Sequence, residues 1–361
     1  MVQFIKFKQE HMMTHYKTLM MLPGTPGDES NIRDYVKAHI AKFPQYMVIE
    51  DHLGSIFAFK KGTGDSKVMI AGHMDEVGFM VVGITNQGQL NIQPVGGIDP
   101  KIVLAQTYDV HTEKGIIKGY IGAIPPHLNL QQNVNYESIL VDIGASSKEE
   151  ASELGVQLGD RITFEPRFEQ LTKHRFLAKA VDNRYGVGLA LELIEALKDQ
   201  TFDYDLYIGA TVQEEVGLRG AETSINTIEP DVFIALDASP MNDANGDTDN
   251  ALNKGFLLRM YDPRNTMPEY LKQNIVSLAE RHNIPYQYYI SKGGTDAAKA
   301  LNMHQGIVST TIGLPARYIH SPAAIFDKRD LNACFQMTKT ILTTLDHNKI
   351  QGLKKGEFDV L

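Results

Sequence analysis

The chain has 361 residues, which is enough for one large domain or for a large domain with a smaller one. Hydrophobic residues make up 43% and charged residues 22% of the chain, as in ordinary soluble globular proteins. The formal net charge is -9 and the sequence has no long basic run, which argues against nucleic acid as the main partner.

Neither the N-terminal segment nor the cysteine content indicates secretion or membrane insertion. The first 24 residues predict an amphipathic helix that ends at a Pro-Gly pair, and charges interrupt its apolar positions. Such a segment is neither a signal peptide nor a membrane span. The single cysteine, Cys334, cannot form an intramolecular disulfide, and its helical pattern predicts a buried structural residue. A reducing, cytoplasmic location is therefore expected.

A helix and a strand come next, before the pattern changes. Residues 31–43 have helical spacing, and residues 66–72 form a short apolar run typical of a buried strand. From about residue 77 to residue 166, short strand-like runs follow one another, punctuated by glycine, asparagine and proline. One helical pattern interrupts them, at residues 147–155. We interpret this stretch as a small β-rich, barrel-like unit inserted into an α/β domain.

Beyond the insertion, helices and strands alternate again. This alternation favours a mixed, largely parallel sheet flanked by helices. The predicted domains are therefore an α/β domain of residues 1–75 and 168–361, and an inserted β-rich domain of residues 76–167. In the last part of the α/β domain, strands are expected at residues 175–181, 204–212, 231–239 and 304–315, and helices at residues 182–199, 266–283 and 327–347.

Histidine and acidic side chains follow most of the predicted strands. In open α/β sheets, ligands bind at the carboxyl ends of the strands. Imidazole and carboxylate groups are the ligand types for zinc and related divalent metals. Each residue alone has an ordinary explanation, such as a helix N-cap for Asp182, but their repetition predicts a metal site. The residues concerned are His73, Asp75, Asp182, Glu214, Glu215, Asp237 and His320.

Two of these acids, Glu214 and Glu215, are adjacent in an apolar and glycine-rich passage. Burying two carboxylates together is unfavourable, because like charges repel and each group loses its hydration. On a regular strand, neighbouring side chains point to opposite faces, so both acids can serve one site only where the strand ends. The glycines at positions 217 and 220 suit such an end. We interpret the pair as two acids with different roles.

Six motifs resemble those of the tetrahedral-type dinuclear metallo-aminopeptidases, and most closely their glutamyl aminopeptidase members. The resemblance runs from about Gly54 to Asp330, and the motifs occur in the expected order. The stretch PGTPGDE, at residues 23–29, departs from the Ser-Gly-containing turn of the family. The six motifs are GHMDEVGFMV, AVDNRYGVGLALEL, VQEEVGLRGA, ALDASP, GGTDAAKA and PARYIHSPAA.

The resemblance implies a zinc-peptidase-like catalytic domain that holds two divalent metal ions, zinc or cobalt by preference and manganese as a third choice. It implies that Glu214 acts as general base and acid, accepting a proton from the attacking water and passing it to the leaving amine. Asp75 would lie behind His73 and orient the catalytic groups. The implied metal ligands are Asp182 as the bridge, His73 and Asp237 at one ion, and Glu215 and His320 at the other.

The resemblance also implies the substrate and the assembly. Peptides with a free N-terminus would lose their first residue, with a preference for Glu or Asp if Lys292 or Arg259 supplies a cation to the pocket. The inserted unit would be a dimerisation domain, and dimers would assemble into a tetrahedral dodecamer. Alternatives are an aminopeptidase of neutral or broad specificity, a related di-metal deacylase or carboxypeptidase, a glucanase, and a non-catalytic subunit.

Overall fold

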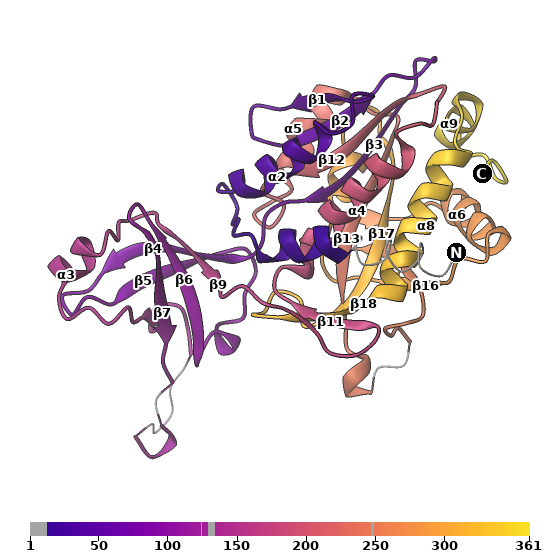
Figure 1. The fold of residues 1–361 in the computed structure, drawn as a ribbon. Coiled ribbons are helices and arrows are strands. Elements are labelled where there is room, and N and C mark those ends of the chain that lie inside the picture. Colours follow the sequence, from indigo (N-terminus) through magenta and orange to yellow (C-terminus); the bar gives the residue numbers. More distant parts are fainter. Residues whose placement is uncertain (1–12, 124, 129–133, 247–248) are drawn as a thin grey trace.

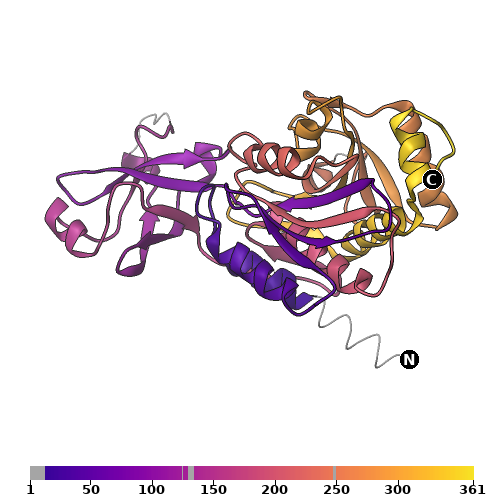
Figure 2. The same cartoon turned by 90° about the horizontal axis from the view of Figure 1, so that it is seen from above.

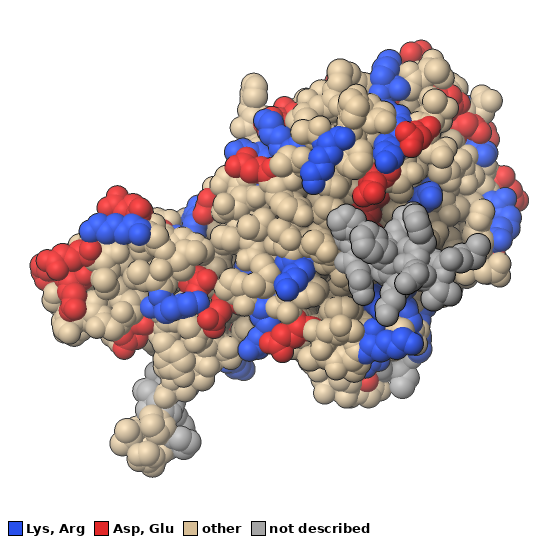
Figure 3. Space-filling model, viewed as in Figure 1, with Lys and Arg blue, Asp and Glu red and all other residues tan. Residues whose placement is uncertain are grey.

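The computed structural model of this chain describes residues 13–123, 125–128, 134–246 and 249–361. It has a large lobe of helices and strands and a smaller β-rich lobe that projects from one side (Figures 1 and 2). Lys and Arg side chains are interspersed with Asp and Glu over the face drawn in Figure 3. Residues 13–21 are helical, and the earlier part of the predicted N-terminal helix lies outside the described residues.

A twelve-stranded mixed sheet forms the middle of the large lobe. Its central strands β12, β3, β13 and β17 run parallel, and antiparallel strands flank them on both sides. The predicted fold class, a mixed sheet flanked by helices, is confirmed. The strands are β1 (Met47–Glu50), β2 (Ile56–Lys60), β3 (Lys67–His73), β10 (Phe168–Gln170), β11 (Arg175–Ala178), β12 (Asp205–Thr211), β13 (Val232–Met241), β14 (Phe256–Asp262), β15 (Asn265–Thr266), β16 (Tyr286–Ile290), β17 (Val308–Arg317) and β18 (Ala324–Asp327).

Helices cover both faces of this sheet, so the central strands are buried on both sides. Along β3, Val68 and Ile70 face the core shared with α4 and α8, whereas Met69 faces the core shared with α5 and α7. This alternation explains why the strand reads as a continuous apolar run. The helices of the lobe are α2 (Ser30–Ile40), α4 (Val181–Leu197), α5 (Arg219–Ile228), α6 (Glu269–Arg281), α7 (Asp296–Leu301), α8 (Lys328–Thr344) and α9 (His347–Lys354).

Cys334 lies on α8, where it is fully buried. Its thiol donates to the carbonyl oxygen of Gly313 on β17, at 3.4 Å. The expectation of a buried structural cysteine is therefore confirmed. None of the helices within the described part of the chain has the length and apolarity that crossing a bilayer would require.

The small lobe is a six-stranded antiparallel sheet in the order β7, β6, β9, β4, β5, β8. A bridge between Tyr120 and Asp142 joins its two ends, so that the sheet is nearly closed into a barrel. Phe79, Tyr108 and Phe164 pack together in its core. Its elements are β4 (Gly78–Ile84), β5 (Leu90–Val95), β6 (Gln106–Thr112), β7 (Gly115–Ile121), β8 (Leu140–Val141), α3 (Lys148–Glu153) and β9 (Arg161–Phe164).

Candidate active site

Close packing of α4 on the sheet brings the first candidate residues together. A Cβ atom on Gly72, the residue before His73, would lie 2.5 Å from the backbone carbonyl carbon of Gly186 on α4. A Cβ atom on Gly186 would in turn lie 2.5 Å from the carbonyl oxygen of Leu236, the residue before Asp237. Only glycine permits these approaches, which place the start of α4 against the carboxyl end of β3 and the middle of β13.

Asp182 lies at this start of α4, between the two candidate histidines. Its Oδ1 is 3.2 Å from Nε2 of His73, and its Oδ2 is 3.2 Å from Nε2 of His320. The backbone of Asp182 is non-helical (φ -84°, ψ 107°), and the side chain that caps the regular helix after it is Asn183, whose Oδ1 accepts from the N–H of Gly186 at 3.2 Å. The alternative explanation of Asp182 as an ordinary helix cap is therefore wrong.

The remaining acids surround the same two imidazoles. Glu215 Oε1 lies 3.3 Å from His320 Nε2, whereas Asp237 Oδ1 lies 3.7 Å from His73 Nε2. Glu214 Oε2 is 3.9 Å from His73 Nε2. The structure thus brings the predicted residues into one cluster, although Asp237 lies within β13 rather than after its end.

Backbone carbonyls fix the orientation of both imidazole rings. His73 Nδ1 lies 3.0 Å from the carbonyl oxygen of Asp75, and His320 Nδ1 lies 2.7 Å from that of Gly97. A carbonyl oxygen can only accept, so each Nδ1 must donate a proton and each Nε2 is left to face the acids. Gly97 follows β5, so the small lobe contributes directly to the site.

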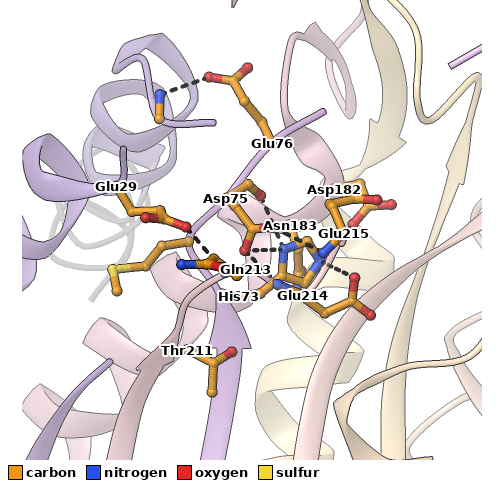
Figure 4. Close-up of polar contacts among 12 residues, drawn as sticks. Glu29, His73, Asp75, Glu76, Asp182, Asn183, Thr211, Gln213, Glu214 and Glu215 are labelled. Atoms are coloured by element: carbon orange, nitrogen blue, oxygen red, sulfur yellow. Dashed lines mark hydrogen bonds and ion pairs between the residues drawn. The ribbon is translucent and has the colours of Figure 1, made fainter. Parts of the chain in front are cut away.

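Asp75 explains how two adjacent acids can serve one cluster. Strand β12 ends at Thr211, and Gln213 adopts a positive φ of 54° just before the acid pair. The backbone N–H groups of Glu214 and Glu215 then donate to Oδ1 and Oδ2 of Asp75, both at 3.0 Å (Figure 4). Oδ1 of Asp75 also lies 3.5 Å from Nδ1 of His73, so the same carboxylate lies beside this imidazole and holds the turn.

Electrostatic repulsion within the cluster favours a bound cation. Burial holds the pKa of Glu214 well above its usual range, and the charges of Asp237 and Glu215 raise it further, although His73 opposes them. Burial is also the main cause of the raised pKa values of Glu215 and Asp237. Divalent cations would offset such repulsion between carboxylates.

The donor set fits a metal. Asp182 Oδ1 is buried and has no hydrogen-bond partner among the described residues. Two overlapping triads, His73–Asp182–Glu215 and His73–Glu214–Asp237, each present ligand atoms within 4.8 Å of one another. Buried imidazole and carboxylate groups in this arrangement are typical ligands of zinc and related divalent metals. The site can therefore hold a metal ion with the residues that it has.

A buried ion network that sequence analysis missed supports the loop after His73. Glu76 accepts from Lys179 Nζ at 2.5 and 2.8 Å and from Arg184 at 3.2 Å, and all three side chains are almost fully buried. The Nε of Arg184 also donates to the carbonyl oxygen of Met74 at 2.6 Å. Removing one partner of a buried ion pair leaves an uncompensated charge, so this network fixes the loop strongly. In the sequence, the only indication of this network is that its charged residues stand inside apolar runs.

The cluster opens into a cavity of about 1300 Å³ that both candidate specificity residues also line. Arg259 is buried there, and its guanidinium donates to the carbonyl oxygen of Gly293 and to the hydroxyl of Ser239, both at 2.8 Å. Lys292 is exposed at the same cavity, and so is Arg264, which sequence analysis did not consider. The lining of the cavity thus combines the acidic cluster with three cationic side chains, Arg259, Arg264 and Lys292.

Residues 54–337 match the model of the M42 glutamyl aminopeptidase family. The chain belongs to the M42 family. The matched residues include every member of the cluster. This M42 chain is therefore an aminopeptidase, a hydrolase, and the resemblance inferred from its six motifs is confirmed.

Known proteins that are similar to this M42 chain over most of their length differ in the residue that their names specify. A glutamyl aminopeptidase of Lactococcus lactis subsp. cremoris is 38% identical, covering 94% of this chain and 98% of its own. A lysyl aminopeptidase of Pyrococcus furiosus is 36% identical, covering 91% and 96%. The structure of the TET1 peptidase of Pyrococcus horikoshii, described as assembling into a tetrahedron or a large octahedral shell, is 32% identical with a TM-score of 0.83, covering 92% and 99%.

Proposed function

We propose that this M42 chain is a dinuclear metal-dependent aminopeptidase that removes N-terminal residues from peptides and prefers Glu and Asp. The observation that carries the proposal is the position of Asp182. Its two oxygens lie at the same distance, 3.2 Å, from Nε2 atoms of two different histidines. A carboxylate placed in this way can serve two ions at once. Zinc and cobalt are the first candidates, and manganese is the next.

The ligands divide between the two histidines. His73 and Asp237 would complete one site, and His320 and Glu215 would complete the other, with Asp182 shared between them. When bound, two neighbouring divalent ions lower the pKa of a water and polarise a carbonyl oxygen. The carbonyl groups of Asp75 and Gly97 hold the imidazoles in the tautomer that this binding needs.

Glu214 is the acid left over for proton transfer. Its carboxylate faces the same cavity as the ligands, and its backbone is fixed by Asp75. We assign it the removal of a proton from the attacking water and the delivery of that proton to the leaving amine. General acid–base catalysis of this kind contributes about 10²–10⁴-fold to a rate.

Lys292 is the best candidate for recognising an acidic side chain. Arg259 already donates to two protein oxygens, whereas Lys292 is exposed at the cavity and its ammonium can turn towards a ligand. Lys292→Met is expected to lower kcat/KM for glutamyl substrates by about 10-fold or more, because a charged hydrogen bond contributes about 1.5–3 kcal/mol. Hydrolysis of leucyl substrates, measured in parallel, should change little. Equal losses on both substrates would assign Lys292 a structural role instead.

The proposal as a whole is tested by a substrate panel run on the metal-free and reloaded enzyme. The chelated protein should be inactive, and zinc, cobalt or manganese should restore hydrolysis. Glu- and Asp-anilides should then be cleaved faster than Leu- and Lys-anilides. Full activity after complete chelation would contradict the metal requirement. A preference for Leu or Lys would refute the acidic specificity, and the protein would then be an aminopeptidase with a different substrate preference.

We further propose that the chain forms a homo-oligomer, built from dimers that use the small lobe and assemble into a tetrahedral dodecamer. The tetrahedral assembly described for the similar Pyrococcus horikoshii TET1 peptidase supports this proposal. The small lobe projects away from the large lobe, which leaves its surface accessible to a second copy (Figure 2). The mass in solution, measured by light scattering, tests it.

A further inference from the structure

Glu29 is a buried acid just before α2, and capping of that helix does not explain why it is buried. It occupies the N-cap position of α2, but its side chain makes no capping hydrogen bond to that helix. Only 6% of Glu29 is exposed. Its Oε1 accepts instead from the backbone N–H of Gly27 at 2.9 Å and from that of Gln213 at 3.1 Å. Figure 4 shows the carboxylate pointing at Gln213, far along the chain.

Gln213 is the residue at which the chain turns towards the cluster. Its positive φ of 54° is unfavourable for a residue with a Cβ atom, so surrounding contacts must hold it. Glu29 supplies the acceptor for its N–H group. Asp75 supplies the acceptors for the next two N–H groups, those of Glu214 and Glu215. Three consecutive backbone donors therefore end on two buried carboxylates from different segments.

We propose that Glu29 is a positioning residue, which fixes Gln213 and thereby aims the Glu214 carboxylate. The inference rests on the proposed role of Glu214 in proton transfer. Among the described residues, the Glu29 side chain accepts from the backbone of Gly27 and Gln213 and not from a proposed metal ligand, and Glu215 keeps its own acceptor on Asp75. Loss of Glu29 should therefore disturb the proton carrier more than the metal. Glu29, the last residue of the segment that departs from the family pattern, would then help to position the catalytic acid.

Variants at position 29 separate the reach of the side chain from its charge. Glu29→Ala and Glu29→Asp are expected to lower kcat by about 10- to 100-fold, because a displacement of about 1 Å can cost that much. Glu29→Gln keeps an oxygen at the right reach and should retain most activity. Burial, aided by the charge of Asp75, raises the pKa of Glu29 to about 7, so a neutral side chain is tolerable there. Asp28→Ala is the matched control, since Asp28 is an exposed acid on the same turn.

The readouts distinguish positioning from a general structural role. In Glu29→Ala and Glu29→Asp, KM should stay within about 2-fold and the metal content should be unchanged, because only the proton-transfer step is affected. Unchanged kcat in both variants would overturn the inference. So would loss of metal in parallel with kcat, or an equal loss of kcat in Glu29→Gln.

A double variant keeps this inference separate from the proposed function. If Glu29 acts through Glu214, adding Glu29→Ala to Glu214→Gln should cause no further loss, because the two effects are coupled. Multiplied losses would show that Glu29 acts independently and would overturn the inference alone. Full activity of the single Glu214→Gln variant would instead refute the proposed function on which it rests.

Discussion

Glu214→Gln is expected to keep its full metal content while kcat falls by about 10²–10⁴-fold, the usual contribution of a general acid–base group. The amide has the shape of the carboxylate but neither accepts the water's proton nor returns one to the leaving amine. The variant should fold normally, because the Glu214 side chain is not needed for the backbone contact with Asp75. Elemental analysis beside steady-state kinetics measures both quantities.

A surface acid on the neighbouring helix provides the control for this variant. Glu222 on α5 pairs with Lys299 and is half exposed, so Glu222→Gln changes the same charge outside the cavity and should leave kcat unchanged. If Glu214→Gln were active, Glu214 could not be the proton carrier. If it lost metal, Glu214 would have to be reassigned as a ligand.

Asp182→Ala is expected to abolish both metal binding and turnover. Asp182 is the only residue of the described cluster whose two oxygens each approach a different histidine, so no neighbour can replace it. Glu215→Ala is expected to have a smaller effect on metal binding. Glu215 lies beside His320 alone, so its loss should remove the metal ion from one site only. Metal titration of the chelated proteins gives the stoichiometry of each variant.

Folding of the variant must be checked separately from metal binding. Asp182→Ala should retain the circular dichroism spectrum of the metal-free wild-type enzyme, since Oδ1 of Asp182 is buried without a hydrogen-bond partner among the described residues. Full metal binding by a folded Asp182→Ala variant would show that the bridge is misassigned.

The residues of the cluster could be predicted because they follow apolar runs. Strand β3 is buried on both faces, and an apolar run that ends in His73 therefore marks both a central strand and its carboxyl end. The same reasoning located Asp237, Glu214 and Glu215. It also located His320, whereas the division of the ligands between two ions came only from the family resemblance.

The supporting contacts could not be predicted because they involve backbone groups or distant segments. The Gly97 carbonyl that orients His320 has no side-chain signal, and it comes from the inserted lobe. Glu29 reaches Gln213 across 184 positions in the chain. Strands β14 and β16 both line the cavity, and β14 carries Arg259. Their sequences mix polar and aromatic residues and show no clear alternation of hydrophobic and polar positions. Such contacts arise from tertiary packing, which a single sequence does not encode locally.

Anomalous diffraction from crystals of the metal-loaded enzyme tests the central claim most directly. We predict two anomalous peaks in the cluster, one beside His73 and Asp237 and one beside His320 and Glu215, with Asp182 adjacent to both. In crystals of the active enzyme saturated with metal, a single peak, or peaks that lie away from Asp182, would contradict a dinuclear centre bridged by this residue.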